Sequence, residues 1–178
     1  MRVIAGSRKG HRISAPHGDA TRPTGDRVRE AAFNLIGPVD GARVLDLFAG
    51  SGAMGLEALS RGADRAVFVE SDADAARAIE RNLDKLRLTG ATVLRRDALQ
   101  ALAAETAAGR DYDLVLVDPP YAMFADLQPQ LARYLPSILA PDGLVVYETG
   151  DKQHPELPLA ERTSRKYGSV RLTLFEQP

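Results

Sequence analysis

The chain has 178 residues, of which 44% are hydrophobic, so it can bury a sizeable core and we expect one compact domain. It contains no cysteine, which excludes disulfide bonds and zinc–thiolate sites, and its three scattered histidines give no reason to expect a metal. The net charge of −1 hides an asymmetry, because residues 1–29 carry seven basic and two acidic side chains, a net +5, and the remainder carries −6.

The first 25 residues are predicted to form a small hairpin with a basic tip, followed by a loop. Residues 2–5 and 11–14 have the pattern of short strands, and the prolines and glycines of residues 15–25 favour a loop. Because Lys and Arg that neutralise phosphates supply most non-specific affinity for nucleic acids, this basic end favours contact with a polyanion. A solvated arm explains the charge equally well.

A helix is predicted next, with Asp26 as its N-cap and Gly37-Pro38 as its stop. Its apolar residues recur at helical spacing, so one side is expected to lie against a sheet. The other side is then expected to present Arg27, Arg29 and Asn34.

From residue 43 onward, short apolar runs alternate with helical patterns. We predict strands at 44–47, at 66–69, before Asp97, before Asp118 and at 143–147, and helices at 53–61, 73–88, 98–108 and roughly 124–138. This alternation implies a parallel sheet covered on both faces. The last two segments, 161–167 and 170–176, are separated only by Gly168-Ser169 and are predicted to pair as an antiparallel hairpin at one edge.

The stretch from Arg43 to Gly55 carries the first indication of a ligand site. An apolar strand is followed by Gly50-Ser51-Gly52-Ala53-Met54-Gly55, a GxGxxG pattern that leads into a helix. Glycines there allow positive φ angles and close approach of the backbone to a ligand. The pattern alone is weak, because a tight turn with Gly55 packed against the sheet accounts for it as well.

Four acids at the ends of four predicted strands strengthen that indication: Asp46, Glu70, Asp97 and Asp118. Any one of them can be an ordinary turn residue. In an open α/β sheet, however, ligands bind in the crevice outside the carboxyl ends of the strands. The ordered set therefore predicts a ligand crevice there.

Asp118-Pro119-Pro120-Tyr121 matches the (Asp/Asn/Ser)-Pro-Pro-(Tyr/Phe) motif of methyltransferases that act on exocyclic amino groups of bases. The Asp118 carboxylate and the Pro119 carbonyl can accept the two amino N–H bonds, and the prolines stiffen the loop. Tyr121 offers a face for base stacking, which is worth about 1–3 kcal/mol. A parallel sheet with a C-terminal antiparallel hairpin also resembles the class I S-adenosylmethionine-dependent methyltransferase fold, a Rossmann-like, mainly parallel seven-stranded sheet.

That resemblance gives the acids roles toward S-adenosylmethionine as the cofactor. Glu70 would accept the ribose hydroxyls, Asp97 the adenine amino group with the Ala98 backbone donating, and Asp46 would lie near the ammonium group. An acid just before the glycine turn suits a cationic ligand better than the pyrophosphate of NAD. The remaining residues expected to contact the cofactor are Phe48, Gly50, Ser51, Gly52 and Ser71.

Four segments resemble the RsmD family, the bacterial 16S rRNA guanine-N2 methyltransferases: residues 21–34, 46–62, 68–70 and 118–121. The resemblance implies methylation of one guanine of 16S rRNA, within the 30S subunit or an assembly intermediate, by a monomer. From the charge distribution and the order of the predicted elements, we expect a basic N-terminal hairpin or arm, residues 1–25, and a Rossmann-like methyltransferase domain, residues 26–178. No apolar run has the length of a signal peptide or membrane span, which favours a soluble, cytoplasmic protein without membrane contact.

The basic end supplies the expected nucleic-acid contacts: Arg8, Lys9, Arg22, Thr24, Arg27 and Arg29. For the arginines, ion pairs with Asp26 or Glu30 on the helix surface are the alternative. Three other functions stay open, namely an adenine-N6 or other amino-methyltransferase on DNA or RNA, a non-catalytic RNA-binding scaffold, and an NAD-linked oxidoreductase. A complete set of acids and glycines argues against a scaffold, and no well-placed histidine supports hydride transfer.

Overall fold

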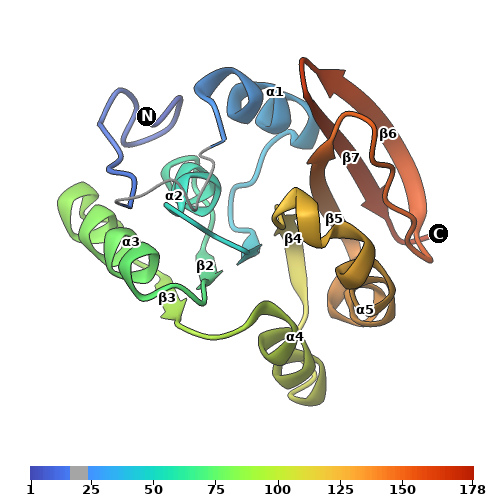
Figure 1. The fold of residues 1–178 in the computed structure, drawn as a ribbon. Coiled ribbons are helices and arrows are strands. Elements are labelled where there is room, and N and C mark those ends of the chain that lie inside the picture. The colour runs from blue at the N-terminus through green and yellow to red at the C-terminus, as the bar shows by residue number, and fades with distance from the viewer. Residues whose placement is uncertain (17–23) are drawn as a thin grey trace.

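The computed structural model describes residues 1–16 and 24–178, which form a seven-stranded sheet with helices on both faces (Figure 1). Within these residues, no helix is both long enough and apolar enough to cross a lipid bilayer. In chain order the elements are α1 (Asp26–Ile36), β1 (Arg43–Leu47), α2 (Ala53–Ser60), β2 (Arg65–Val69), α3 (Ala73–Leu86), β3 (Ala91–Leu94), α4 (Ala98–Ala107), β4 (Tyr112–Val117), the 3-10 turn η1 (Tyr121–Met123), α5 (Phe124–Ile138), β5 (Leu139–Gly150), β6 (Ala160–Tyr167) and β7 (Val170–Glu176).

The strands lie in the order β3-β2-β1-β4-β5-β7-β6. Neighbouring strands from β3 to β5 pair in parallel, whereas β7 runs antiparallel to both β5 and β6. The predicted α/β fold and its C-terminal antiparallel hairpin are therefore confirmed. The strand order reverses between β1 and β4, which is where open α/β sheets bind their ligands.

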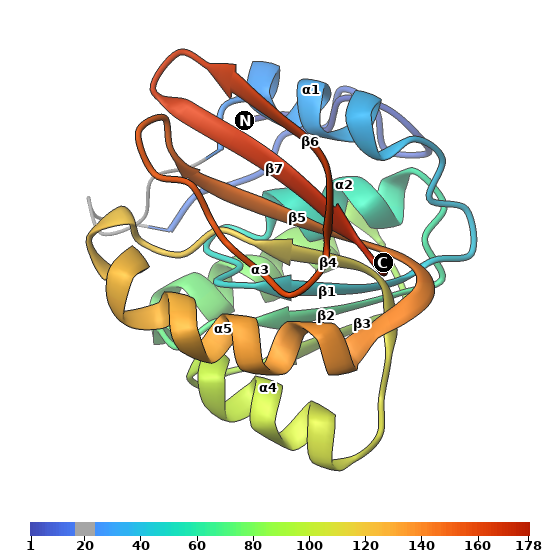
Figure 2. The same cartoon turned by 90° about the vertical axis from the view of Figure 1, so that its right-hand side faces the viewer.

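Two hydrophobic layers hold the helices against the sheet, and Figure 2 shows α1 and α2 on one side with α4 and α5 on the other. Phe33, Leu56 and Ile79 bring α1, α2 and α3 into the first layer. Along β1 the side chains alternate, because Val44 faces the first layer and Leu45 the second. Burial on both faces explains why the strand sequences are almost continuously apolar.

The observed boundaries depart most from the sequence prediction at two strands, while several other elements differ by one or two residues. β5 runs from Leu139 to Gly150, longer than the predicted 143–147, because it pairs with β4 on one side and β7 on the other. The prediction that Asp97 ends the third strand is wrong, since β3 stops at Leu94. Asp97 instead caps α4, and its Oδ1 accepts hydrogen bonds from the backbone of Leu99 and Gln100 at 3.0 and 3.1 Å.

The N-terminal residues 1–16 pack against α2. They contain an isolated antiparallel bridge between Arg2 and Arg12 in place of two predicted strands, and Val3 and Ile13 are buried in the first hydrophobic layer. Gly6 sits at the point of closest approach with a φ of 84°, and a Cβ there would lie 1.9 Å from the Ser60 carbonyl oxygen. Only glycine fits that contact.

Candidate active site

A cavity of about 580 Å³ opens at the carboxyl ends of β1, β2, β4 and β5. This volume is in the range of sites that hold a cofactor-sized ligand. All but one of the predicted catalytic and cofactor residues line it: Asp46, Phe48, Gly50, Ser51, Glu70, Ser71, Asp97, Ala98, Asp118, Pro119, Pro120 and Tyr121. The exception is Gly52, where a Cβ would lie 3.1 Å from Ile79 Cγ1 and 3.4 Å from Phe68 Cε1, both side chains of the first hydrophobic layer.

The loop between β1 and α2 curls around the cavity in an unusual backbone conformation. Phe48, a non-glycine residue, has a φ of 58°, which is uncommon for a bulky side chain and is typical of functional loops. Gly50 has the same φ of 58°, and nothing lies within 4 Å of where its Cβ would be. This open space lets a ligand approach the backbone closely.

Asp46 is a buried carboxyl group at the floor of the cavity, 3% exposed. Its Oδ2 accepts a hydrogen bond from the Gly55 backbone at 2.9 Å. Burial raises the pKa of Asp46 to about 8; the hydrogen bond from Gly55 opposes this rise and the negative charge of Glu70 adds to it. A buried carboxyl group of this kind favours a cationic ligand nearby.

Glu70 follows β2 directly and supports the loop from the opposite side. Its two carboxylate oxygens accept hydrogen bonds from the backbone of Gly50 at 2.9 Å and of Asp72 at 2.8 Å. Each carboxylate oxygen has two lone pairs, so Glu70 keeps acceptor capacity toward the cavity while it fixes the loop.

The residues present fit S-adenosylmethionine. A buried acid suits the cationic methionine part, an acid after the second strand suits ribose hydroxyls, and the unobstructed face of Gly50 permits close contact. Asp46, Glu70 and Asp97 would hold the donor, which supplies an electrophilic methyl group when bound.

The predicted catalytic corner begins where β4 ends. Asp118 and the two prolines continue directly from the strand, and Tyr121 opens the 3-10 turn η1. The turn is anchored by Gln153, whose side-chain amide donates a hydrogen bond to the Tyr121 carbonyl at 2.9 Å. Met123, 45% exposed, lies on the rim of the cavity. The corner is therefore a stiff wall of the same cavity that contains Asp46 and Glu70.

Sequence reasoning missed Glu148, which also lines the cavity and is 8% exposed. Its carboxylate lies 3.3 Å from the Thr24 hydroxyl and 3.4 Å from the Tyr121 hydroxyl. The Thr24 hydroxyl also lies 3.4 Å from Asp118 Oδ2. The signal was available, because Glu148 directly follows the strand predicted at 143–147, in the same position as the other acids.

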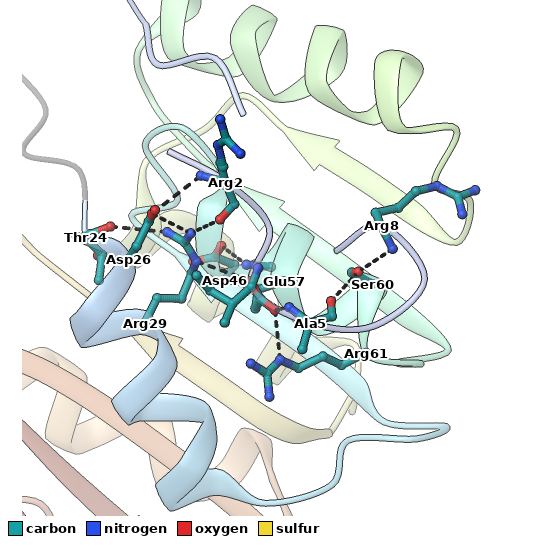
Figure 3. Close-up of polar contacts among 12 residues, drawn as sticks. Arg2, Ala5, Arg8, Thr24, Asp26, Arg29, Asp46, Glu57, Ser60 and Arg61 are labelled. Carbon is teal, nitrogen blue, oxygen red and sulfur yellow. Dashed lines mark hydrogen bonds and ion pairs between the residues drawn. The ribbon is translucent and has the colours of Figure 1, made fainter. Parts of the chain in front are cut away.

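The prediction that Arg29 faces nucleic acid is wrong. Arg29 is fully buried between α1 and α2, where it pairs with Glu57 at 3.4 Å and Asp26 at 2.9 Å (Figure 3). It also donates hydrogen bonds to the backbone carbonyls of Thr24 and Arg2. Asp26 is the first residue of α1 rather than its N-cap, which is Gly25.

The other predicted nucleic-acid residues lie in different surroundings. Lys9 and Arg27 are exposed, whereas Arg8 is partly buried and donates hydrogen bonds to backbone carbonyls at the end of α3. Thr24 lines the cavity. Arg22 lies outside the described residues.

The fold is that of S-adenosylmethionine-dependent methyltransferases, and the cavity lies at the carboxyl ends of the strands, where such α/β sheets bind their ligands. The family described as "Conserved hypothetical protein 95" matches residues 1–176. The chain belongs to this family, the RsmD family.

Individual relatives agree with this assignment. The Bacillus subtilis protein YlbH is 50% identical over 123 residues, which cover 68% of this chain and 67% of that protein. Ribosomal RNA small subunit methyltransferase D of Escherichia coli is 42% identical over 122 residues, covering 68% of this chain and 60% of that protein. The solved structure of Thermus thermophilus protein TTHA0928 has a TM-score of 0.85 and 35% identity, with 99% of both chains covered.

Proposed function

We propose that the protein methylates the exocyclic N2 amino group of a guanine in 16S rRNA, using S-adenosylmethionine. The observation that carries the proposal is the position of the Asp118-Pro119-Pro120-Tyr121 corner in one wall of the cavity that also contains Asp46 and Glu70. The name of the Escherichia coli relative, a small subunit rRNA methyltransferase, supports rRNA as the substrate. We further propose a cytoplasmic monomer that acts on the 30S subunit or an assembly intermediate.

In this proposal the corner holds and orients the amino group. The lone pair of a base amino group is delocalised into the ring, so the group is a poor nucleophile. Asp118 and the Pro119 carbonyl accept its two N–H bonds and direct the lone pair toward the donor end of the cavity. Asp118 is then the group that accepts the proton lost by the nitrogen.

Tyr121 stacks on the base once it has left the RNA stack, and the exposed Met123 borders the same opening. Lys9 and Arg27, both exposed, contact phosphates of the surrounding RNA. The basic N-terminal hairpin or arm, residues 1–25, thus binds the RNA together with Arg27, and the domain of residues 26–178 carries out the chemistry.

The test is transfer of labelled methyl groups to 30S particles from cells that lack the activity, followed by mass spectrometry of the rRNA nucleosides. We expect label in N2-methylguanosine with this protein and a rate of labelling lower by a factor of about 10² to 10⁴ with Asp118→Ala. Label in N6-methyladenosine would overturn the choice of guanine. Absence of transfer, together with absence of donor binding in calorimetry, would favour a non-catalytic scaffold.

A further inference from the structure

We infer that Glu148 selects guanine by accepting the N1–H of the target base beside Asp118, which holds the neighbouring amino group. The inference rests on the proposed function and adds a specificity-determining residue to it.

The placement of Glu148 follows from the sheet register. Val117, the last residue of β4, pairs with Tyr147 of β5, so Asp118 follows the end of β4 beside Glu148, which is still within β5. Strands in a sheet are about 4.8 Å apart. The Thr24 hydroxyl lies 3.4 Å from one carboxylate and 3.3 Å from the other, which places both groups on the same side of the cavity.

Guanine offers two adjacent donors on its Watson–Crick edge, the N1–H and the N2 amino group. Two neighbouring carboxylates match that edge, because ionised carboxylates only accept hydrogen bonds. Adenine and 2-aminopurine carry a lone pair at N1, which would face the carboxylate of Glu148 without a proton between them. A site built to hydrogen-bond an N–H group rejects analogues without it strongly, because its buried acceptor is left unpaired.

Two hydroxyl groups lie next to the two oxygens of this carboxylate. Tyr121 lies 3.4 Å from Glu148 Oε1, and Thr24 lies 3.3 Å from Oε2. Tyr121 is also the proposed stacking surface. Glu148, which would bind the Watson–Crick edge of the base, therefore contacts the residue that would stack on the face of the base. Glu148 is nearly buried, so its hydrogen bond to the base would compete little with water.

The experiment exchanges the base and the residue together. Once the methylated position has been mapped, 16S rRNA is ligated around a synthetic oligonucleotide with guanine or 2-aminopurine at that position and assembled into particles. 2-Aminopurine keeps the amino group but has no proton on N1. The ratio of kcat/KM for the two particles is measured for the parent and for Glu148→Gln, whose amide can accept from guanine or donate to the N1 of 2-aminopurine.

We expect the preference for guanine to fall at least tenfold in Glu148→Gln and to stay unchanged in Glu161→Gln, the same substitution at an exposed position of β6 in the same sheet. The ratio is insensitive to the active fraction of a preparation, so partial unfolding cannot imitate the result. If the ratio is unchanged in Glu148→Gln and the parent is active on guanine, the inferred role of Glu148 is wrong, but the proposed function still stands. A parent that methylates neither particle would overturn the proposed function as well.

Discussion

Arg29 Nε lies 3.4 Å from Glu57 Oε1, and both side chains are fully buried. The same Glu57 carboxylate accepts hydrogen bonds from the backbone of Ile4 at 2.7 Å and Ala5 at 3.0 Å, and pairs with Arg61 at 2.8 Å (Figure 3). One carboxylate of α2 therefore connects the N-terminal hairpin, α1 and its own helix. A buried charge that is fully paired is tolerated, but removing its partner is costly.

Glu57→Ala should lower the free energy of unfolding by about 3–5 kcal/mol, because it leaves the buried Arg29 with Asp26 as its remaining carboxylate partner and removes the acceptor of the Ile4 and Ala5 backbone N–H groups. Urea unfolding at neutral pH measures the change. Glu80→Ala, at an exposed position of α3, is the control and should stay within about 0.5 kcal/mol of the parent. A loss below about 1 kcal/mol for Glu57→Ala would mean that the pair contributes little.

Gly6→Ala should loosen the N-terminal hairpin from α2, because its Cβ would overlap the Ser60 carbonyl. Gly10→Ala is a matched control, since Gly10 also has a φ of 84° but nothing lies within 4 Å of its Cβ position. Amide hydrogen exchange of residues 1–16 should accelerate at least tenfold more in Gly6→Ala than in Gly10→Ala. Equal acceleration would assign the effect to backbone strain alone.

The pH dependence of donor binding should report on Asp46. Its pKa is raised to about 8 by burial, so the carboxyl group is mostly protonated at pH 6–7 in the free protein. A cationic donor favours the ionised form, so binding should release a proton and the affinity should rise as the pH increases from 6 to 8. Calorimetry in buffers of different ionisation enthalpy measures the release.

Asp118→Ala and Glu70→Ala should separate catalysis from binding. Without Asp118 the amino group loses its acceptor, so kcat should fall by a factor of about 10² to 10⁴ while the Kd for the donor changes little. Glu70→Ala should instead raise that Kd, since both the ribose contact and the support of Gly50 are lost. Near-normal methyl transfer by Asp118→Ala would show that its role is misassigned.

Replacing Lys9 and Arg27 together by alanine should weaken binding to rRNA and flatten its salt dependence. Two lost phosphate contacts should reduce the slope of log Kobs against log salt by about 1.4 to 1.8. Because both side chains are exposed, thermal stability should not change. An unchanged slope in filter-binding titrations would remove these two residues from the interface.

Much of the fold could be predicted because its local signals are strong. The helix predicted at roughly 124–138 corresponds to α5, and the strand predicted at 170–176 matches β7 residue for residue. Apolar periodicity and turn residues act over short distances, so a single sequence contains them. The acids at the ends of the predicted strands could also be found from the local pattern. Since the carboxyl ends of parallel strands lie at one edge of the sheet, these acids were expected to lie close together.

The sequence analysis failed where the position of a side chain depends on a partner far away in the sequence. Arg29 precedes Ala32 and Phe33 by three and four residues, so helical spacing already placed it on the apolar side of α1. Its charge favoured a surface position, and nothing local reveals Glu57 as its partner 28 residues later. Glu148 could have been found as an acid that directly follows the strand predicted at 143–147, whereas its proximity to Asp118 depends on the register in which β4 and β5 pair.

The N-terminal segment also contributes Ala15, Pro16 and Thr24 to the lining of the cavity. This segment cannot be exchanged between relatives on its own, because the Glu57 and Ser60 side chains of α2 accept hydrogen bonds from its backbone. Chimaeras that exchange residues 1–25 alone should fold poorly, and those that exchange α1 and α2 with them should retain both the docking contacts and the shape of the substrate entrance. In this family, the segment that borders the substrate entrance and the helices that support it would then have to change together during evolution.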